Sequence, residues 1–249
     1  MVDKDIIFGK RAVSEALRAQ VPITQILLAN NLGRDRSMED IVSRAESANI
    51  AIKSVPKAKL DGHVEGLSGG AHQGIVAIAT PYKYADIFDV LSSIDGGKAL
   101  LVICDHITDA GNLGAIVRSA ESVGAAGVVI PNKRCAQVTP VTYKTSAGAI
   151  AHVPIVQVSN IARTLEDLKN QGFWTVAATE HAQDLLWDTD MEGRIALVVG
   201  NEHDGVSQLV LKSCDMRCRL PQMGSVSSLN VAQASTVFMY EWLRQNDCG

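Results

Sequence analysis

Three short polar clusters hold most of the side chains in this sequence that are suited to chemistry. They are NLGAIVR (112–118), GNEHDG (200–205) and GSVSSLN (224–230). Their amides, hydroxyls, carboxylates and single guanidinium can orient a ligand and stabilise a developing negative charge. Each cluster also has a plain structural explanation, because Asn and Ser often begin helices and Gly often forms turns. The chemical interpretation gains weight because all three clusters follow or flank predicted strands.

The elements that position these clusters are predicted from apolar periodicity. From Ala99 onward, strands are predicted at ALLVICD, GVVIP, VPIVQV, FWTVAA, IALVVG and MRCRL. Helices are predicted between them at NLGAIVRSAESVGA, PVTYKTSAGAIA, IARTLEDLKNQ and VSQLVLKSC, with a last helix after Asn230. Near-continuous apolar strands that alternate with helices indicate an α/β fold with a mostly parallel sheet covered on both faces. Such sheets bind ligands at the carboxyl ends of their strands, where the clusters are expected.

The first 80 residues form a separately patterned α/β unit. Helices are predicted at RAVSEALRA and MEDIVSRAESA, and strands at ITQILLA, IAIKSV and GIVAIAT. The pattern is then interrupted at PYKYADI, where a proline enters and the apolar alternation stops. We therefore predict a domain at residues 1–80, a linker at 81–98 and a second domain at 99–249.

Several common sites are disfavoured by the sequence. A dinucleotide fold would place GxGxxG after its first strand, but here the turn carries only Gly111 and Gly114, in HITDAGNLGAIVRSA. Walker loops and GxSxG elbows are also missing from the sequence. Cys214 and Cys218 have no matching second pair, and tetrahedral zinc needs four ligands, so no metal is expected.

Composition and charge describe a soluble chain with an uneven charge distribution. The 249 residues are 47% apolar with a net charge of −4. Residues 1–80 carry a net charge of +1 and residues 81–249 a net charge of −5, so a polyanion is expected to contact the first segment. The candidate cations are Arg34, Arg36, Arg44, Lys53, Lys57 and Lys59. A solvated helical face explains these charges about as well.

The cysteines and the apolar runs bear on the compartment. The five cysteines are scattered and odd in number, which is typical of reduced thiols. The start, MVDKDIIFGKRA, lacks the apolar core of a signal peptide, and no apolar run approaches the length needed to span a bilayer. We expect a cytoplasmic protein.

The trio NLGAIVRSAE, LVVGNEHDGVS and LPQMGSVSSLNVAQA resembles the three motifs of the SpoU/TrmH branch of the SPOUT RNA methyltransferases. The resemblance covers about residues 99–245, and SVSSLNVAQA is its most specific part. The first segment, with FGKRAVSEAL and HQGIVAIA, is similar to the ribosomal-protein-like substrate-binding domain of the RlmB-type large-subunit rRNA guanosine 2′-O-methyltransferases. The family often has Pro before the motif Asn. Ala110 and Gly111 occupy that stretch here, so a looser approach to Asn112 is expected.

The resemblance implies a deep trefoil knot in the second domain and transfer of a methyl group from S-adenosyl-L-methionine to a ribose 2′-hydroxyl. It implies backbone contacts to the cofactor at Gly200, Leu220 and Leu229, with Met223, Ser228 and Asn230 nearby. Knots are rare exceptions to unthreaded chain topology. Small residues around the last helix's start would let backbone groups reach the cofactor.

The catalytic residues implied by the resemblance are Arg118, Asn112, Glu202, Ser228 and Asn230. Neutralising an arginine at pH 7 costs about 7 to 9 kcal/mol, so we expect a charged Arg118 that binds phosphate and stabilises the oxyanion, with the proton leaving to water or phosphate. A general-base role for Arg118 is the alternative. Glu202 would orient Arg118 or the substrate, and Asn112 would hold the ribose or the arginine. The structural alternative for Arg118 is a surface ion pair with Glu121.

Partners and alternatives complete the sequence-based expectations. RNA, most plausibly rRNA, is the expected substrate, and the first domain points away from the runner-up, tRNA. An antibiotic-resistance rRNA methyltransferase, a non-catalytic RNA-binding factor and an oxidoreductase remain alternatives. The family pairs its knotted domains, so we expect a homodimer, with Phe238, Trp242 and Leu243 of the last helix as a self-complementary apolar patch.

Overall fold

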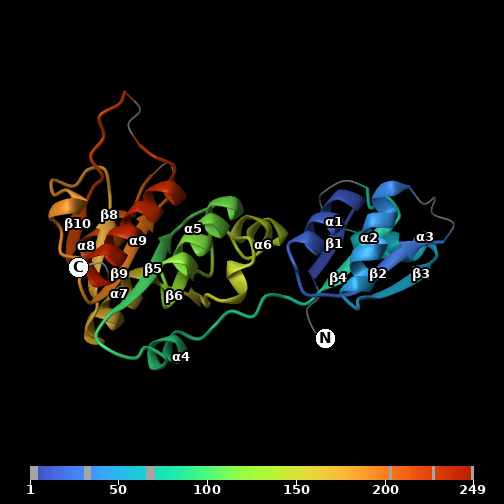
Figure 1. Cartoon of the computed structure of the whole chain (residues 1–249), viewed down its shortest axis with the longest axis horizontal. Coiled ribbons are helices and arrows are strands. Elements are labelled where there is room, and N and C mark those ends of the chain that lie inside the picture. The colour runs from blue at the N-terminus through green and yellow to red at the C-terminus, as the bar shows by residue number, and fades with distance from the viewer. Residues whose placement is uncertain (1–4, 31–34, 66–70, 202–203, 226–227, 248–249) are drawn as a thin grey trace. The chain divides into compact units, whose positions relative to one another are not determined.

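The computed structural model describes residues 5–30, 35–65, 71–201, 204–225 and 228–247. The chain forms two compact units, residues 1–83 and residues 84–249 (Figure 1). The division falls inside the segment around Pro81 where the sequence loses its pattern.

The first unit is a four-stranded mixed sheet with helices on both faces. Its strands are β1 (Asp5–Phe8), β2 (Ile23–Ala29), β3 (Ala51–Val55) and β4 (Ile75–Ala79). The order is β1-β4-β2-β3, in which β4 is antiparallel to both neighbours and β2 is parallel to β3. All five residues of β4 are buried, as expected for a strand covered on both faces.

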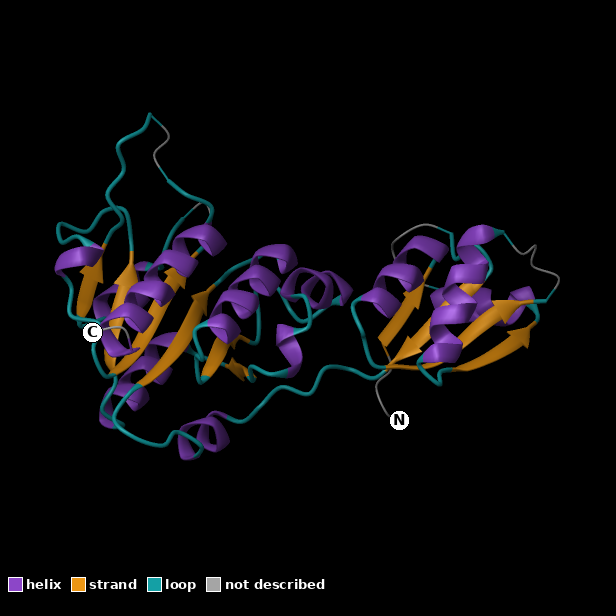
Figure 2. Ribbon diagram, viewed as in Figure 1, coloured by secondary structure: helices purple, strands orange, loops and turns teal. Residues whose placement is uncertain are grey.

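The helices of the first unit are α1 (Lys10–Arg18), α2 (Arg36–Ser47) and α3 (Lys57–Val64). Leu60 of α3 is fully buried and packs with Val76 and Ile78 of β4. Because side chains alternate along a strand, Ile75 and Ala77 point to the opposite face, where α1 and α2 pack against each other (Figure 2). The sequence did not predict β1 or α3.

The second unit has a six-stranded sheet in which every pair is parallel. Its strands are β5 (Ala99–Asp105), β6 (Gly127–Pro131), β7 (Ile155–Val158), β8 (Trp174–Ala178), β9 (Arg194–Gly200) and β10 (Met216–Cys218). Their order is β10-β8-β9-β5-β6-β7. Strand β9 lies between β8 and β5, so the sheet grows in both directions from the β5–β9 pair, and the mostly parallel α/β fold is confirmed.

Helices cover both faces of this sheet (Figure 2). They are α4 (Ile87–Ser92), α5 (Ala110–Ser122), α6 (Pro140–Ser146), α7 (Ile161–Asn170), α8 (Gln208–Ser213) and α9 (Val231–Asp247), with 3-10 turns at Ala149–Ala151 and Leu186–Asp188. Val90 of α4, Leu165 of α7 and Val210 of α8 share one buried cluster with the strands. Helix α5 packs against both α6 and α9. Only α4 and the 3-10 turn at 186–188 lie outside the predicted elements of this unit.

The last helix corrects the predicted apolar patch. Phe238 and Trp242 are buried inside the unit, and the Trp242 indole donates a hydrogen bond to the Gly193 carbonyl oxygen at 3.2 Å. Leu243 is half-buried. The apolar excess on this helix therefore fills the core of its own unit, because α9 packs on β9 and on the turn at 186–188.

Candidate active site

The candidate site lies at the carboxyl edge of the second sheet. Strands β5 and β9 are neighbours, and Asp105 stands opposite Gly200 in their register. The chain turns from β5 into α5 and from β9 toward α8, so the clusters that follow both strands meet at one edge (Figure 1). The strand order reverses direction at this pair, and parallel α/β sheets bind ligands at the carboxyl ends of strands where such a reversal occurs.

Helix α5 holds Asn112 firmly at this edge. The Asp109 carboxylate is the helix N-cap and accepts a hydrogen bond from the Asn112 backbone N–H at 2.7 Å. A Cβ on Gly111 would lie 2.9 Å from Asp109 Oδ1. The Asp109 carboxylate thus fixes the backbone at Asn112, and the looser approach expected from the missing proline stays a prediction.

Gly114 sets the depth of α5 against α6. A Cβ at this position would lie 2.7 Å from the Thr142 carbonyl oxygen and 3.1 Å from the Ser146 backbone nitrogen. Only glycine permits this approach without a backbone shift. Gly114, the third residue of NLGAIVR, which the sequence suggested as a turn glycine, is therefore a helix-packing residue.

Asn112 and Asn230 are hydrogen-bonded, although 118 positions separate them. The Asn230 side-chain oxygen accepts from the backbone N–H groups of Ala232 and Gln233 at the start of α9, at 2.9 and 3.4 Å. Its amide nitrogen donates to Asn112 Oδ1 at 3.0 Å. About two helical turns further along, Ser119 and Thr236 join the same two helices through their hydroxyls at 2.7 Å. The structure thus unites the first and third predicted clusters.

Arg118 lies exposed on α5. Among the residues that the structure describes, its guanidinium makes no hydrogen bond or ion pair, including with Glu121, so the surface ion pair that was the structural alternative is not formed. The side chain is exposed, so a ligand phosphate could reach it.

The loop after β9 folds back onto its own strand. Asn201 and Gly205 exchange two backbone hydrogen bonds of 3.0 Å each, and the Asn201 amide donates to the His106 carbonyl oxygen at 2.9 Å. A Cβ on Gly200 would lie 2.1 Å from the Gly205 carbonyl carbon and 2.2 Å from the Val206 nitrogen. Gly200 is thus required by backbone contact. Glu202 lies outside the described residues.

Two residues of the site were missed by the sequence reasoning. Asp105 is buried at the end of β5, where its carboxylate accepts the Ser207 backbone N–H at 2.7 Å and lies 2.6 Å from His106 Nδ1. An aspartate that ends the otherwise apolar run ALLVICD was the available signal, since a buried carboxylate needs hydrogen-bond partners.

The segment between β10 and α9 carries the remaining predicted cofactor residues, and the structure does not bring them to the amide pair. Leu220 is half-buried, Met223 is 99% exposed, and Ser228 and Leu229 are exposed, the latter at 49%. The segment projects beyond the carboxyl edge of the sheet (Figure 1). Asn230, at the end of the segment, is hydrogen-bonded to Asn112 on the helix that follows β5.

The chemistry of this edge is that of positioning and charge stabilisation. It presents an amide pair, a guanidinium and an imidazole held by a carboxylate, which suit a polar substrate that develops negative charge. Within the described ranges, no group of three or more His, Cys, Asp or Glu side chains is arranged to hold a metal ion. No helix in the described part of the chain has both the length and the apolar character needed to cross a membrane.

Comparisons with known proteins agree with these features. Residues 99–240 match the SpoU rRNA Methylase family, and residues 6–85 match the family of RNA 2′-O ribose methyltransferase substrate-binding domains. A Staphylococcus aureus protein whose name places it among the TrmH family tRNA/rRNA methyltransferases is 37% identical, over 98% of this chain and 97% of its own. A Bacillus subtilis protein with the same family name, YacO, is 36% identical over 98% of this chain and 96% of its own.

Solved structures share the fold. An RNA 2′-O ribose methyltransferase is 26% identical with a TM-score of 0.64 and covers 98% of this chain and 89% of its own. The Streptomyces viridochromogenes SpoU methyltransferase AviRb, 24% identical, has a TM-score of 0.66 and covers 97% of this chain and 90% of its own. With its first motif joined to its third at the carboxyl edge and a family match over both units, the chain belongs to the SpoU family of RNA methyltransferases.

Proposed function

We propose that this chain transfers a methyl group from S-adenosyl-L-methionine to the 2′-hydroxyl of a guanosine in large-subunit rRNA. Family membership makes it an RNA methyltransferase that uses this cofactor. The observation that carries the site assignment is the bond between Asn112 and Asn230, on the helix that also presents Arg118. The proposal extends the family assignment to a reaction centre and an RNA class.

The residues after β10 fit the cofactor. Met223 and Leu229 leave apolar side chains in water on an otherwise polar segment next to Asn230. A ligand with an adenine ring and an amino-acid chain would cover apolar side chains that lie beside a few fixed hydrogen-bonding groups. When bound, the cofactor supplies an activated methyl group. Gly200, Leu220, Met223, Ser228 and Leu229 would hold it, in the knotted arrangement that the family resemblance implies.

The protein's own groups would orient the substrate and stabilise charge. Arg118, as a fixed cation, binds a substrate phosphate and the oxygen that becomes negative as its proton leaves. Asn112, oriented by Asn230, holds the ribose. Glu202, which lies outside the described residues, is proposed to orient the arginine, and Ser228 to line the same site.

The first unit supports rRNA over tRNA. The structure of the A. aeolicus TrmH/SpoU tRNA modifying enzyme matches only 63% of this chain, whereas the RNA 2′-O ribose methyltransferase matches 98%. The additional coverage includes the substrate-binding family match at residues 6–85. We propose that this unit selects the RNA.

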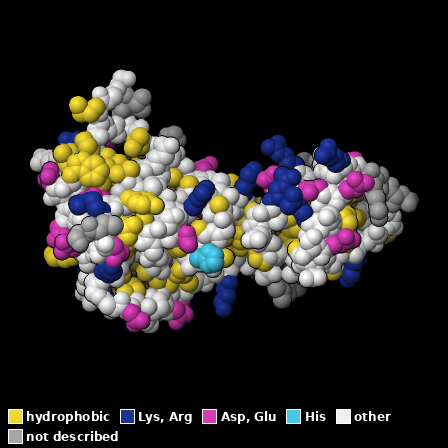
Figure 3. Space-filling view, in the orientation of Figure 1, with side chains coloured by type: hydrophobic (Ala, Val, Ile, Leu, Met, Phe, Trp, Pro, Cys, Tyr) yellow, Lys and Arg dark blue, Asp and Glu magenta, His cyan; other side chains and the backbone are white. Residues whose placement is uncertain are grey.

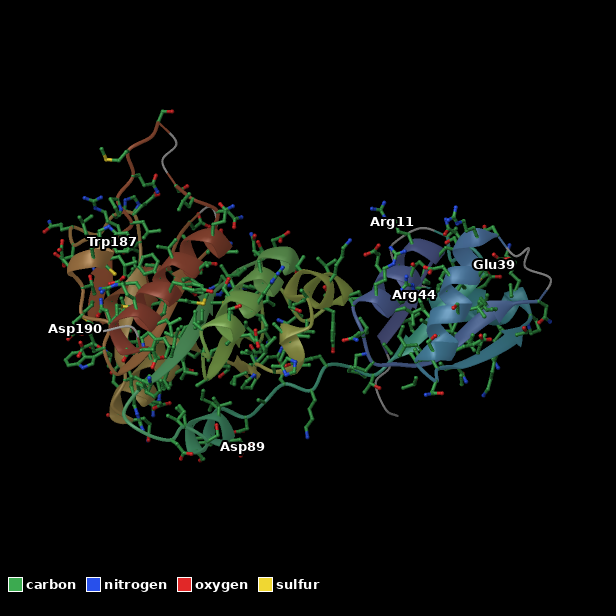
Figure 4. The ribbon with its side chains drawn as sticks, viewed as in Figure 1. Arg11, Glu39, Arg44, Asp89, Trp187 and Asp190 are labelled. Atoms are coloured by element: carbon green, nitrogen blue, oxygen red, sulfur yellow. The ribbon has the colours of Figure 1, made fainter. Side chains whose placement is uncertain are left out.

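The structure narrows the candidate cations for RNA contact. Arg34 lies outside the described residues, and Arg44 is ion-paired with Asp40 at 3.0 Å. Figure 3 shows that cations over α1 and α2, where Figure 4 labels Arg11 and Arg44, lie among acidic side chains. Arg36, the first residue of α2, is exposed and forms no ion pair with any described residue. On β3 and α3, the same holds for three exposed lysines: Lys53, Lys57 and Lys59. We propose that these three contact phosphates.

A charge-removal experiment tests the RNA surface. Changing Lys53, Lys57 and Lys59 together to Gln should weaken RNA binding and lower the salt dependence of affinity by about three phosphate contacts. Arg44→Gln, which removes a neutralised cation, is the matched control and should change both much less. Unchanged RNA affinity in the triple variant would place the contact elsewhere.

We also propose a homodimer, through a surface other than the one first expected. Trp187 and Tyr240 are 50% and 49% exposed on the second unit. Figure 3 shows a yellow patch where Figure 4 labels Trp187. Sedimentation should show a dimer for the wild type and a monomer for Trp187→Asp. A wild-type monomer at micromolar concentration with full activity contradicts this proposal.

The main experiment maps 2′-O-methyl positions in total RNA from wild-type and deletion strains. Loss of one methylated guanosine in large-subunit rRNA, restored in vitro by the purified protein with the cofactor, supports the proposal. If a methylated tRNA position is lost, the reaction is as proposed but the substrate is tRNA. If a methylated adenosine is lost, the protein acts on the nucleotide expected of an antibiotic-resistance methyltransferase. No lost position, together with no cofactor binding by calorimetry, would overturn it.

A further inference from the structure

The second unit has a small group of exposed cations without a counter-charge. Residues 81–249 carry a net charge of −5, and exposed cations such as Lys98, Arg163 and Arg244 are paired with carboxylates. Within the described residues, four exposed Lys and Arg side chains of this unit form neither an ion pair nor a hydrogen bond: Arg118, Lys133, Arg134 and Lys212. All but the last of these follow β5 or β6, which are neighbouring strands. The uncompensated positive charge of this unit therefore lies mainly beside these two strands.

The turn after β6, residues 132–138, is bonded to the segment that leads into α5. The Ala136 backbone N–H donates to the Ile107 carbonyl oxygen at 2.7 Å, and Ile107 lies two residues before Asp109, the N-cap of α5. Consecutive Cα atoms are about 3.8 Å apart, so the Cα atoms of Lys133 and Arg134 lie within about 12 and 8 Å of that of Ala136. The backbone that carries the two cations is therefore held close to the start of α5.

The turn continues into α6, which packs on the first half of α5 (Figure 1). A Cβ on Gly111 would lie 3.9 Å from Thr145 Cγ2, and a Cβ on Gly114 would lie 2.7 Å from the Thr142 carbonyl oxygen. Because residues four apart share one face of a helix, Arg118 lies on the same side of α5 as Gly114. Arg118 therefore borders the contact between α5 and α6, and the turn leads directly into that contact.

Hydrogen bonds fix the turn on both of its sides. At its start, the Asn132 backbone N–H donates to the Val158 carbonyl oxygen at 2.9 Å, and the Cys135 thiol donates to the Pro131 carbonyl oxygen at 2.7 Å. At its end, the Val138 backbone N–H donates to the Tyr84 hydroxyl at 3.1 Å. A backbone that is already ordered loses little conformational freedom when its side chains bind a ligand.

We propose that Lys133 and Arg134 bind backbone phosphates of the RNA, in nucleotides close to the one that is methylated. Phosphate oxygens are the groups that exposed Lys and Arg contact in nucleic acids, and an acidic unit without such contacts would repel the strand. Phosphate contacts carry no sequence information, so this turn positions a strand that the first unit selects. This inference rests on the proposed function and adds a second RNA surface to the one on β3 and α3.

The test measures RNA affinity against salt concentration for the double variant Lys133→Gln, Arg134→Gln. Glutamine has positive φ at Gln20 and Gln73 in this chain, so it is compatible with the φ of +57° at Arg134. The probe is protein-free large-subunit rRNA from the deletion strain, in 50 to 200 mM salt. Loss of two phosphate contacts should lower the slope of log affinity against log salt by about 1.4 to 1.8. Across this range the wild type should therefore lose about 7- to 12-fold more affinity than the variant.

Lys212→Gln is the matched control. Lys212 is also exposed and unpaired within the described residues, but it lies on α8, which packs against α7. This control should keep the wild-type slope. The double variant should keep the wild-type cofactor affinity and thermal unfolding temperature. If it unfolds earlier, Lys133→Gln alone, which leaves the positive-φ residue in place, should lower the slope by about 0.7 to 0.9.

The outcomes separate this inference from the proposed function. If these variants keep the wild-type salt slope, or lose cofactor affinity in place of RNA affinity, the inference is overturned while the wild type still methylates RNA. A wild type that methylates no RNA overturns the proposed function and this inference with it.

Discussion

The two sides of the candidate active site differ in how firmly their residues are held. On the β5–β9 side, buried strands, close glycine contacts and paired polar groups fix Asn112, Asp105 and Gly200. On the other side, the segment from β10 to α9 leaves Met223 and Leu229 exposed. The difference indicates that the strand-end side is organised by folding alone, whereas the second side presents apolar groups that a ligand would cover. Substitutions on the first side should therefore affect stability, and those on the second should affect ligand binding.

The largest expected effect is on the organised side, at Gly200. Gly200→Ala places a methyl group 2.1 Å from the Gly205 carbonyl carbon, so the loop backbone must move, and the free energy of unfolding should fall by about 4 kcal/mol. Gly97→Ala is the control in the same unit, because its Cβ meets nothing within 4 Å. Calorimetric unfolding of both variants measures the difference. Equal stability of the two would show that the loop is not fixed as described.

Substitutions of Arg118 should change the methylation rate without changing thermal stability. Arg118→Ala should slow single-turnover methylation about 100- to 1,000-fold, as loss of one charge-stabilising donor does, and Arg118→Lys should lose less because it keeps the charge. Thermal stability should stay at the wild-type value, because the side chain is exposed and makes no bond within the described residues. Arg163→Ala, on α7, is the control for removing a surface arginine. A Lys form whose rate climbs with pH until it exceeds the wild type would mean that residue 118 acts as the base.

The bond between α5 and α9 should have a smaller, measurable energy. Asn230→Ala removes both the helix cap and the bond to Asn112, and should cost about 2 kcal/mol. Asn230→Ser keeps a capping oxygen but is too short to reach Asn112, so it should cost about half as much. A double-mutant cycle with Asn112→Ala by denaturant unfolding measures the coupling directly. Strictly additive effects would show that the two amides do not interact.

Asp215 lies away from the candidate site. Its substitution tests how the stability of the second unit depends on pH. Burial alone would raise the pKa of Asp215, but the Thr175 N–H and hydroxyl and the Lys169 ammonium outweigh burial and lower this pKa below its usual value. A lowered folded-state pKa gives stability that is present above the unfolded-state pKa, near 4, and is lost as the pH falls through the folded value.

Asp215→Asn should therefore cost about 1 kcal/mol at pH 7 and make stability less dependent on pH below 4. Thermal unfolding from pH 3 to pH 7 measures both quantities. If the variant loses as much stability as the wild type when the pH falls to 3, other carboxylates cause the acid sensitivity of the second unit.

The smallest stability effect is expected at Met223, on the open side. Met223→Ala should leave the free energy of unfolding within about 0.5 kcal/mol of the wild type, because the side chain is 99% exposed. Its affinity for S-adenosyl-L-methionine should fall about fivefold if the thioether side chain covers the cofactor. Leu209→Ala, also exposed but on α8, should change neither. If Met223→Ala lowers stability and leaves the affinity for S-adenosyl-L-methionine unchanged, this side is needed for folding and not for ligand binding.

Sequence patterns predicted the strongly apolar elements of this fold and missed several short ones. All six strands of the second sheet were expected, and the apolar runs of β5, β6 and β9 are buried almost completely. Strand β1 has only four residues, α3 buries only Leu60, and α4 has six residues that follow the unpatterned PYKYADI. Such elements form through tertiary contacts that local periodicity does not encode.

Some residues of the candidate site were also predicted from the sequence, and others were missed. Asn112 and Asn230 were found because small polar clusters at strand ends stand out, and their bond confirms that they meet. The Asp105–His106 pair was missed because neither residue belongs to a cluster. Phe238 and Trp242 were assigned to a surface because the sequence does not show that β9 and the turn at 186–188 cover two sides of α9.

The bond between Asn112 and Asn230 also bears on how the enzyme is made. Asn230 lies directly before α9, which begins at Val231, and it orients an asparagine 118 positions earlier in the chain. During synthesis, the first unit and most strands of the second sheet leave the ribosome before this partner exists. The amide pair can form only after Asn230 and the start of α9 have been synthesised, so a shorter chain that already carries the first unit would lack it.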